Sequence, residues 1–253
     1  MIAISLQSGS SGNCTYVETG SVKLLFDAGI TGSQAAERLS AFGRDIRDVD
    51  ALIISHDHSD HVRHAGVYQR KYGMPMFITR RTLQQSVKKY PLGKLGSINY
   101  FSAGEAIHFD SVCVQTIPSP HDAIDGAVFT VSSGNKRLGI MTDLGHAFRE
   151  LCSVIPTLDG IFIESNYDPE MLANGPYPWF LKQRIAGPEG HLSNREAAEL
   201  LLTGTRLKWA CLAHLSNNNN DPEAALRTHR EIIGDRLSLF TASRTSPTGI
   251  LNL

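Results

Sequence analysis

The sequence predicts one domain, residues 1–253, of the α+β class. Three observations support this prediction. With 253 residues, of which 42% are hydrophobic, the chain can bury a core of its own. Several short runs rich in β-branched and other apolar residues end at a polar residue, as strands do where they enter loops. Segments with helix-capping signals lie between these runs, and no repeat or low-complexity linker interrupts them.

Six predicted strands lead directly, or through a short proline-containing turn, to a residue that can bind a metal or transfer a proton. The strands cover residues 23–26, 51–55, 112–117, 138–142, 160–163 and 209–213, and the residues that follow are Asp27, His56, His121, Asp143, Glu164 and His214. Functional groups tend to lie on loops that a rigid scaffold holds. If these strands end at one edge of a sheet, residues far apart in the sequence converge there.

Helices are predicted from their capping residues. Thr31 with Gln34 and Ser193 with Glu196 fit the capping box, and Asp221 with Pro222 begins a further helix that Gly234 ends. One long stretch, Ser165 to Gly190, is rich in turn-forming and aromatic residues and is expected to be irregular. A loop of this length is usually functional or forms an interaction arm.

The composition predicts a soluble, cytoplasmic protein without a membrane segment. The N-terminus has neither a basic start nor an uninterrupted apolar stretch, and no later segment approaches the roughly 20 apolar residues of a membrane span. The four cysteines are scattered and form no CxxC pair, so neither a disulfide framework nor a thiolate metal site is indicated. A net charge of −1 argues against a uniformly basic nucleic-acid-binding surface.

The strongest functional signal is the HxHxDH pattern of residues 56–61, which directly follows an apolar strand. His56 and His58 can serve one ion, while Asp60 and His61 can turn toward a second. Imidazole and carboxylate are ligands of zinc, manganese and iron, and no cysteine narrows the choice. A solvated polar loop is the alternative, but such a cluster after a buried strand favours a site for two divalent metals.

This motif and its partners resemble the metallo-β-lactamase superfamily along the full chain. The resemblance implies a four-layer αββα sandwich with the site between two sheets. It also implies that His56, His58 and His121 bind the first metal, that Asp60, His61 and His214 bind the second, and that Asp143 bridges them. Asp27 would orient ligands without binding metal. Taken singly, His121 or His214 could equally be a structural residue at the end of a strand.

Two adjacent metals can lower the pKa of a water and hold the attacking and leaving oxygens of a phosphoryl transfer. They serve thioesters and lactams equally well, so the fold alone does not decide the substrate. Glu164 and His191 stand where the similar transfer-RNA-processing nucleases carry their HEAT and GHS motifs. The resemblance implies that the glutamate orients a histidine that protonates the leaving oxygen. Only the glutamate of HEAT is retained here, and the alternatives are a loop cap and a surface histidine.

Positive charge is concentrated directly after the metal motif. Residues 62–104 contain eight basic residues and no acidic one, so the remainder of the chain carries −9. Such a segment would attract a phosphate backbone, with Arg80 and Arg81 as candidate contacts. The alternative is a pair of solvated helices whose charges are paired elsewhere.

Further substrate-binding candidates lie in two loops. Ser10, Ser11 and Asn13 belong to a small-residue loop whose backbone amides could approach an anion, or which could be an ordinary tight connection. Lys182 and Arg184 belong to the long stretch before His191.

The segments SGSSGNC, SHDHSDH, NGPYPWFLKQRIAGPEGHLSN and AHLSNNN resemble the YycJ and WalJ (VicX) type of metallo-hydrolase over nearly the whole chain. The resemblance implies a 5′ to 3′ exonuclease acting on DNA rather than RNA. Aromatic residues in the third segment, Tyr177, Trp179 and Phe180, could stack bases, although such residues more often pack against the domain.

Three other functions remain open. A thioester or other ester hydrolase could use the same ligands without Glu164, His191 or the basic segment. A diiron redox protein is disfavoured because such members usually replace the histidine at the position of His58 with a carboxylate. A metal-stabilised, non-catalytic partner of a signalling complex is disfavoured by the complete ligand set. The native metal and the oligomeric state are not readable from the sequence.

Overall fold

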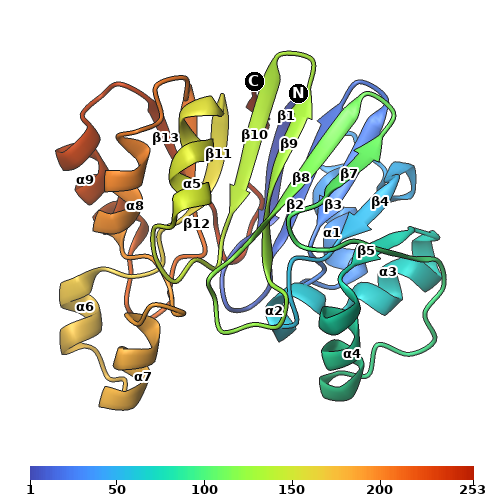
Figure 1. Ribbon diagram of the computed structural model, residues 1–253, viewed down its shortest axis with the longest axis horizontal. Helices are drawn as coiled ribbons and strands as arrows, with labels where there is room; N and C mark the ends of the chain where they lie inside the picture. Colours follow the sequence, from blue (N-terminus) through green and yellow to red (C-terminus); the bar gives the residue numbers. More distant parts are fainter.

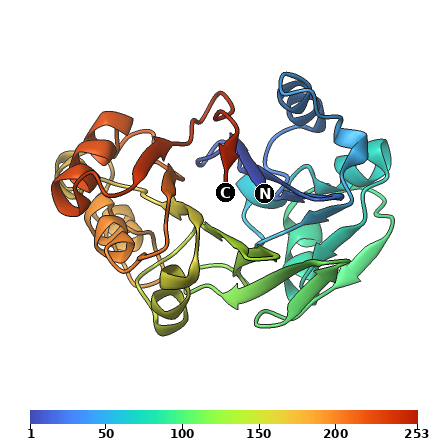
Figure 2. The same ribbon diagram turned by 90° about the horizontal axis from the view of Figure 1, so that it is seen from above.

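The computed structural model describes residues 1–253 and shows two seven-stranded sheets packed face to face, with helices on both outer faces (Figures 1 and 2). The first sheet has the order β14 (Leu251–Asn252), β1 (Ile2–Gln7), β2 (Cys14–Thr19), β3 (Val22–Phe26), β4 (Ala51–Ile53), β5 (Met76–Ile78) and β6 (Ile98–Tyr100). The second has the order β13 (Ser238–Thr241), β12 (Trp209–Ala213), β11 (Gly160–Glu164), β10 (Lys136–Met141), β9 (Ala127–Ser133), β8 (Val112–Pro118) and β7 (Ala106–Phe109). The four-layer αββα sandwich predicted from the sequence is confirmed.

Nine α-helices connect and cover the sheets. They are α1 (Gly32–Ser40), α2 (Ser59–Val62), α3 (Ala65–Tyr72), α4 (Arg80–Lys89), α5 (Arg149–Val154), α6 (Pro169–Asn174), α7 (Trp179–Ile185), α8 (Asn194–Leu201) and α9 (Pro222–Ile233). Two short 3₁₀ helices cover Ile46–Asp48 and Ile155–Thr157. None of the helices is both long and apolar enough to cross a bilayer.

The strands are apolar on both faces because each sheet is covered on both sides. In β3, Leu24 and Phe26 belong to the core between the sheets, whereas Leu25 belongs to the core under the outer helices. This alternation follows from the two-residue repeat of a strand. Across the inter-sheet core the rings of Phe26 and Phe129 are 5.1 Å apart, so the two sheets are joined by direct aromatic packing.

The predicted helix caps are confirmed. Thr31 and Ser193 each form a complete capping box, with Gln34 and Glu196 respectively. Asp221 accepts hydrogen bonds from the backbone of Glu223 and Ala224, Pro222 is the first helical residue, and Gly234 follows α9 with a φ of 65°. These starts were predictable because a cap depends on residues three or four positions apart.

The expectation that Ser165 to Gly190 is irregular was wrong. This stretch contains α6 and α7. The start of α6 carries the signal that correctly marked α9, because Asp168 caps it and Pro169 occupies its first position. Helix α7 follows Pro178 and has no side-chain cap, so its start carried no comparable signal.

Candidate metal centre

The ends of six strands meet at one edge of the sandwich, the lower edge in Figure 1. Strands β3 and β4 of the first sheet, and β8, β10, β11 and β12 of the second, all end there. Their following residues form overlapping clusters whose potential ligand atoms lie within 4.8 Å of one another: His56, His58 and His121; His56, His61 and Asp143; and Asp60, His61 and His214. The structure therefore brings together all seven side chains that the sequence singled out as ligands.

Three of the residues at this edge have a left-handed backbone that non-glycine residues seldom adopt. Asp27, Asp143 and His214 have φ values of 65°, 63° and 55°. Each directly follows, or lies two residues beyond, the end of a strand, so the change of φ turns the chain sharply at that end. Such conformations cost about 1–3 kcal/mol each and cluster at functional sites.

The first ligand group contains buried atoms that no protein group satisfies. Nε2 of His56, Nε2 of His121 and Oδ2 of Asp143 are buried and make no hydrogen bond of good geometry, although Oδ2 of Asp143 lies 3.2 Å from Nε2 of His61 and Nε2 of His121 lies 3.4 Å from Oδ1 of Asp122. The other ring nitrogens are held: Nδ1 of His56 lies 2.9 Å from Ser55 Oγ, and Nδ1 of His121 donates to the Gly190 carbonyl at 2.8 Å. Buried polar atoms are normally paired, so these three fit a bound cation.

His58 is turned differently from His56 and His121. Its Nε2 lies 3.2 Å from the carbonyl and 3.5 Å from Oδ1 of Asp122, which leaves Nδ1 for the ligand cluster. Burial lowers the pKa of both His56 and His58, and neighbouring histidines lower it further. Neutral imidazole is the form that binds a metal, so the lowered pKa of His56 and His58 favours their binding form.

The second ligand group is built around carboxylates. Oδ2 of Asp60 lies 3.4 Å from Nε2 of both His61 and His214, and Oδ2 of Asp143 lies 3.2 Å from Nε2 of His61. Asp143 also lies 3.6 Å from His121, so its two oxygens face both groups. This is the position that a bridging ligand requires.

Neighbouring charges, rather than burial, determine the direction in which the pKa of the histidines in the second group shifts. Burial opposes their protonation, but Asp143 and the other nearby carboxylates outweigh burial and raise the pKa of His61 and His214 well above the usual value. Burial also opposes ionisation of Asp60 and Asp143, and here the histidines prevail and lower the pKa of both carboxyl groups. The carboxylates and the protonated histidines therefore stabilise each other's charge. A divalent cation would supply the positive charge in place of the histidine protons.

Asp27 and Ser55 hold two of the candidate ligands in place. Asp27 Oδ2 accepts from Nδ1 of His61 at 2.7 Å, and the backbone amide and hydroxyl of Ser55 contact the same carboxylate. Ser55 in turn faces Nδ1 of His56, so one carboxylate orients both rings. Asp27 was predicted from the sequence, whereas Ser55 was missed although it directly precedes the motif. Asp122, which holds His58, was missed in the same way beside His121.

Glu164 and His191 form a hydrogen-bonded pair beside the ligand groups. Nδ1 of His191 lies 2.8 Å from Glu164 Oε1, and Nδ1 of His214 lies 2.9 Å from the same oxygen. The backbone amides of Asp143, Leu144 and Leu192 also donate to this carboxylate. Burial opposes its ionisation, but His191 and His214 lower the pKa of Glu164 to about 2. Glu164 therefore stays ionised and fixes the orientation of both rings.

His191 lies over the cavity next to the ligand clusters. Its ring centroid is 5.0 Å from that of His121 and 5.3 Å from that of His214. A cavity of ≈ 400 Å³ opens there, lined by His191 and by several of the candidate ligands. Its walls include Ser10, Tyr90, Tyr177 and Arg184. His191 and several candidate metal ligands thus line one cavity.

Of the three substrate-binding candidates in the small-residue loop, only one lines this cavity. Ser10 lines it, and Ser11 is exposed and accepts from Gln7. Asn13 is buried: its side chain accepts from the Gly9 amide and its Nδ2 lies 3.1 Å from Asp60 Oδ2. Asn13 thus contacts a candidate ligand rather than open space.

The basic candidates are mostly engaged by protein groups. Arg80 stacks over the ring of Tyr100 at 4.0 Å, and Arg81 pairs with Asp125 at 3.0 Å. The Arg81 contact matches the alternative of charges paired elsewhere, whereas Arg80 contacts an aromatic ring and no acidic residue. Lys182 donates to the Ala173 carbonyl at 2.7 Å, and Arg184 pairs with Asp122 at 2.6 Å at the wall of the cavity.

Comparison with known proteins finds three kinds of similarity. The model of the metallo-beta-lactamase superfamily matches residues 8–160. Exodeoxyribonuclease WalJ of Streptococcus pneumoniae serotype 2 (strain D39) is 38% identical over 227 residues, covering 88% of this chain and 84% of that protein. Exodeoxyribonuclease YycJ of Bacillus anthracis is 32% identical over 235 residues, covering 91% of this chain and 88% of that protein. The metallo-beta-lactamase fold protein YhfI from Bacillus subtilis has a TM-score of 0.75 at 14% identity over 98% of both chains, which shows the shared fold.

Proposed function

Because this chain belongs to the metallo-β-lactamase superfamily of metal-dependent hydrolases and, within it, to the YycJ and WalJ type, we propose that it is a 5′ to 3′ exonuclease acting on DNA. The observation that supports phosphodiester cleavage is the Glu164–His191 pair at 2.8 Å beside two ligand groups that share Asp143. A general acid is needed where the leaving group is a poorly acidic sugar hydroxyl.

The ligand set fits two divalent ions, zinc or manganese by its nitrogen and oxygen donors, with iron as a further candidate. His56, His58 and His121 would hold one ion, Asp60, His61 and His214 the other, and Asp143 both. Bound there, the ions would supply a water of lowered pKa and Lewis-acid contacts to the phosphate.

In this proposal, side chains of the protein orient the water, donate the proton and hold the phosphate. Asp60, held by Asn13, orients the attacking water. His191, oriented by Glu164, donates its proton to the departing sugar oxygen. Ser10 and Arg184 line the space in which the scissile phosphate is held.

Digestion of end-labelled DNA and RNA tests the proposal. With manganese or zinc, a 5′ label on DNA should appear at once as a mononucleotide, while a 3′ label should give a ladder of shortening products. Asp143→Asn should lower turnover by at least about a hundredfold while the circular dichroism spectrum stays unchanged. Release of the 3′ label first, or a preference for RNA, would contradict the proposed polarity or substrate.

A thioester or other ester hydrolase is the competing function. The chromogenic phosphodiester bis(p-nitrophenyl) phosphate and a thioester, assayed side by side with the metal-loaded protein, distinguish the two. Cleavage of the thioester alone would establish the competing function.

A further inference from the structure

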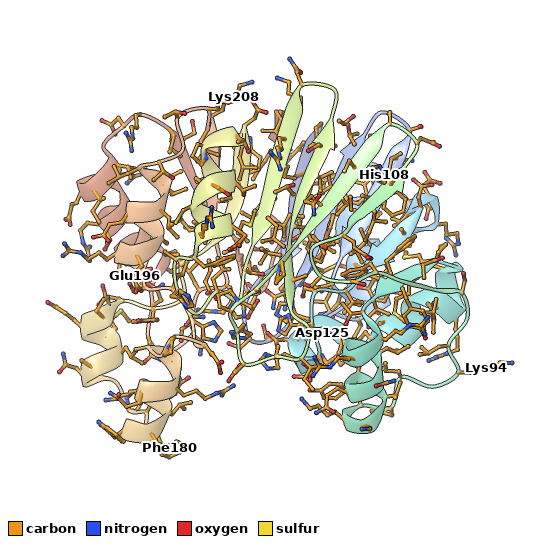
Figure 3. All side chains as sticks on the ribbon, viewed as in Figure 1. Lys94, His108, Asp125, Phe180, Glu196 and Lys208 are labelled. Atoms are coloured by element: carbon orange, nitrogen blue, oxygen red, sulfur yellow. The ribbon has the colours of Figure 1, made fainter.

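Helix α7 exposes two large aromatic side chains next to the metal centre. Trp179 is 74% exposed and Phe180 is 69% exposed, the highest values of any large hydrophobic residue in the chain. No residue of α7 is buried. Figure 3 shows Phe180 at the outer end of this helix, directed away from the sheets. Exposing this much apolar surface on a short helix is unfavourable unless a ligand covers it.

The same helix forms part of the wall of the cavity at the metal centre. Leu181, Arg184 and Ile185 line that cavity together with Tyr177, which precedes the helix. These helical positions are spaced by three and four residues and so share one face. Tyr177 at the cavity wall and the exposed residues Trp179 and Phe180 at the start of α7 are here called the aromatic arm.

The C-terminal end of the helix that carries the aromatic arm is fixed relative to the candidate ligands. The Ile185 carbonyl accepts from the His191 amide at 2.8 Å, and Arg184 pairs with Asp122 at 2.6 Å. The loop after α7 supplies the Gly190 carbonyl that holds His121. Aromatic rings have few rotatable bonds and lose little entropy on binding, so exposed rings on an anchored helix suit a stacking surface.

The charges around the arm identify the kind of ligand. Helix α4 lies at the same edge of the molecule as α7, on the opposite side of the strand ends (Figure 1). Neither helix contains an acidic residue, and together they contain six basic ones. Arg81, Lys89 and Arg184 pair with acidic residues of other segments, whereas Arg80, Lys88 and Lys182 form no ion pair. A second copy of the chain packed on α7 would bring like charges together. A ligand with flat apolar faces and negative charge fits both features.

We propose that the aromatic arm is a stacking platform for the bases of a single-stranded nucleic-acid end whose terminal phosphodiester enters the cavity. This inference rests on the proposed nuclease function and specifies the form of its substrate. The strand leaves the cavity past Tyr177, and its next bases stack on Phe180 and Trp179. Stacking on aromatic side chains tolerates any sequence because every base has a π face.

The fluorescence of Trp179 provides a direct test. The second tryptophan, Trp209, is buried in the core, so the variant Trp209→Phe leaves Trp179 as the sole emitter. The manganese-loaded variant is titrated with a phosphorothioate oligothymidylate, which resists cleavage, and with an abasic oligomer of the same length. Quenching by the thymidylate and little quenching by the abasic strand is the expected result. Equal quenching by both strands would overturn the proposal.

Affinity measurements on variants give a second readout. By fluorescence anisotropy, Trp179→Ala and Phe180→Ala should each raise the Kd for the labelled thymidylate by about fivefold to a hundredfold and leave the Kd for the abasic strand unchanged. Phe240→Ala, which removes an exposed aromatic on β13 away from the metal centre, is the matched control and should affect neither strand. Equal Kd values for all variants would overturn the proposal.

Two further outcomes separate this inference from the proposed function. The arm variants should lower DNA turnover more than turnover of bis(p-nitrophenyl) phosphate, which has no bases to stack. If wild-type protein cleaves neither compound, the proposed function fails, while the quenching result still decides the platform. If size-exclusion chromatography with light scattering shows a dimer that Trp179→Ala dissociates, a second copy occupies the arm and the platform is wrong.

Discussion

His191 has a free ring nitrogen facing the cavity, while its Nδ1 is fixed by a buried carboxylate. The dependence of turnover on the leaving group should reveal its role. His191→Ala should slow DNA cleavage by about 10²- to 10⁴-fold, because a sugar alkoxide is a poor leaving group without a proton donor. Cleavage of bis(p-nitrophenyl) phosphate should fall much less, since p-nitrophenolate leaves unprotonated. Equal losses on both substrates, measured as kcat, would exclude a proton-donating role.

His229 provides a pH-dependent contribution to stability that is independent of the metal centre. It is fully buried in α9, its Nδ1 donates to the Ala225 carbonyl, and its Nε2 has no partner. Burial lowers the pKa of His229 from 6.5 to about 4. Between these values the unfolded chain binds a proton that the folded chain does not, so stability falls as the pH drops from 6.5 to 4.

The loss attributable to His229 should reach about 3 kcal/mol below pH 4, because each pKa unit corresponds to 1.36 kcal/mol. Urea unfolding at pH 7 and pH 4.5 measures it. The variant His229→Phe cannot be protonated and should lose less stability on acidification than wild type. Other titrating groups are common to both proteins and cancel in the difference. Parallel stability curves for the two proteins would contradict this assignment.

At the scale of elements, helix α4 is tied to the metal-binding loop by an ion pair. Asp57 lies between two candidate ligands, its side chain is 1% exposed, and Oδ2 lies 2.5 Å from Lys89 Nζ. Its other oxygen accepts from the Ile124 amide at 2.9 Å. Burial opposes ionisation of Asp57, but Lys89 and this amide prevail and lower its pKa.

Removing Lys89 leaves a buried carboxylate with one donor. Lys89→Met should lower the free energy of unfolding by about 1–3 kcal/mol, the cost of an unsatisfied buried polar group. Lys88→Met is the matched control: Lys88 is exposed, adjacent in the same helix, and forms no ion pair. Urea denaturation of the two variants should separate them, and equal stabilities would show that the Asp57 contact contributes nothing.

The elements show how far local sequence signals extend. The capped starts of α1, α8 and α9 were predictable because the cap and its partner are near neighbours in the chain. Helix α7 lacks a capping side chain and buries no residue, so neither a cap nor an apolar face in the sequence predicted it. The basic segment after the motif was predicted as a possible phosphate-binding surface. Its residues Arg80 and Arg81 contact Tyr100 and Asp125, which lie 20 or more positions away.

At the scale of the whole molecule, the candidate metal centre joins the two halves of the sandwich. His56, His58, Asp60 and His61 follow β4 of the first sheet, while His121, Asp143 and His214 follow strands of the second. An ion bound to residues of both sheets holds the two together in the folded state only. Metal binding should therefore stabilise the entire domain.

Chelation tests this coupling. At a metal concentration about a hundred times the Kd, binding contributes about 2.7 kcal/mol, so excess EDTA should lower Tm by roughly 5–10 °C. His121→Ala removes a ligand from the second sheet and should show a smaller shift. Differential scanning calorimetry with and without chelator measures both. An identical Tm in the two buffers would contradict metal binding across the sheets.

The sequence by itself determined the α+β class, three helix starts and the set of side chains that converge at one edge, and its resemblance to a known superfamily supplied the αββα arrangement. These features depend on strand periodicity, on caps, and on a six-residue motif placed after an apolar strand. Only the tertiary structure decided that Asn13 contacts Asp60, that Ser55 and Asp122 hold histidines, and that Trp179 and Phe180 are exposed. The physical reason is that hydrogen bonds between loops and the burial of a side chain depend on how distant segments pack, whereas caps and strand alternation depend on neighbours in the chain.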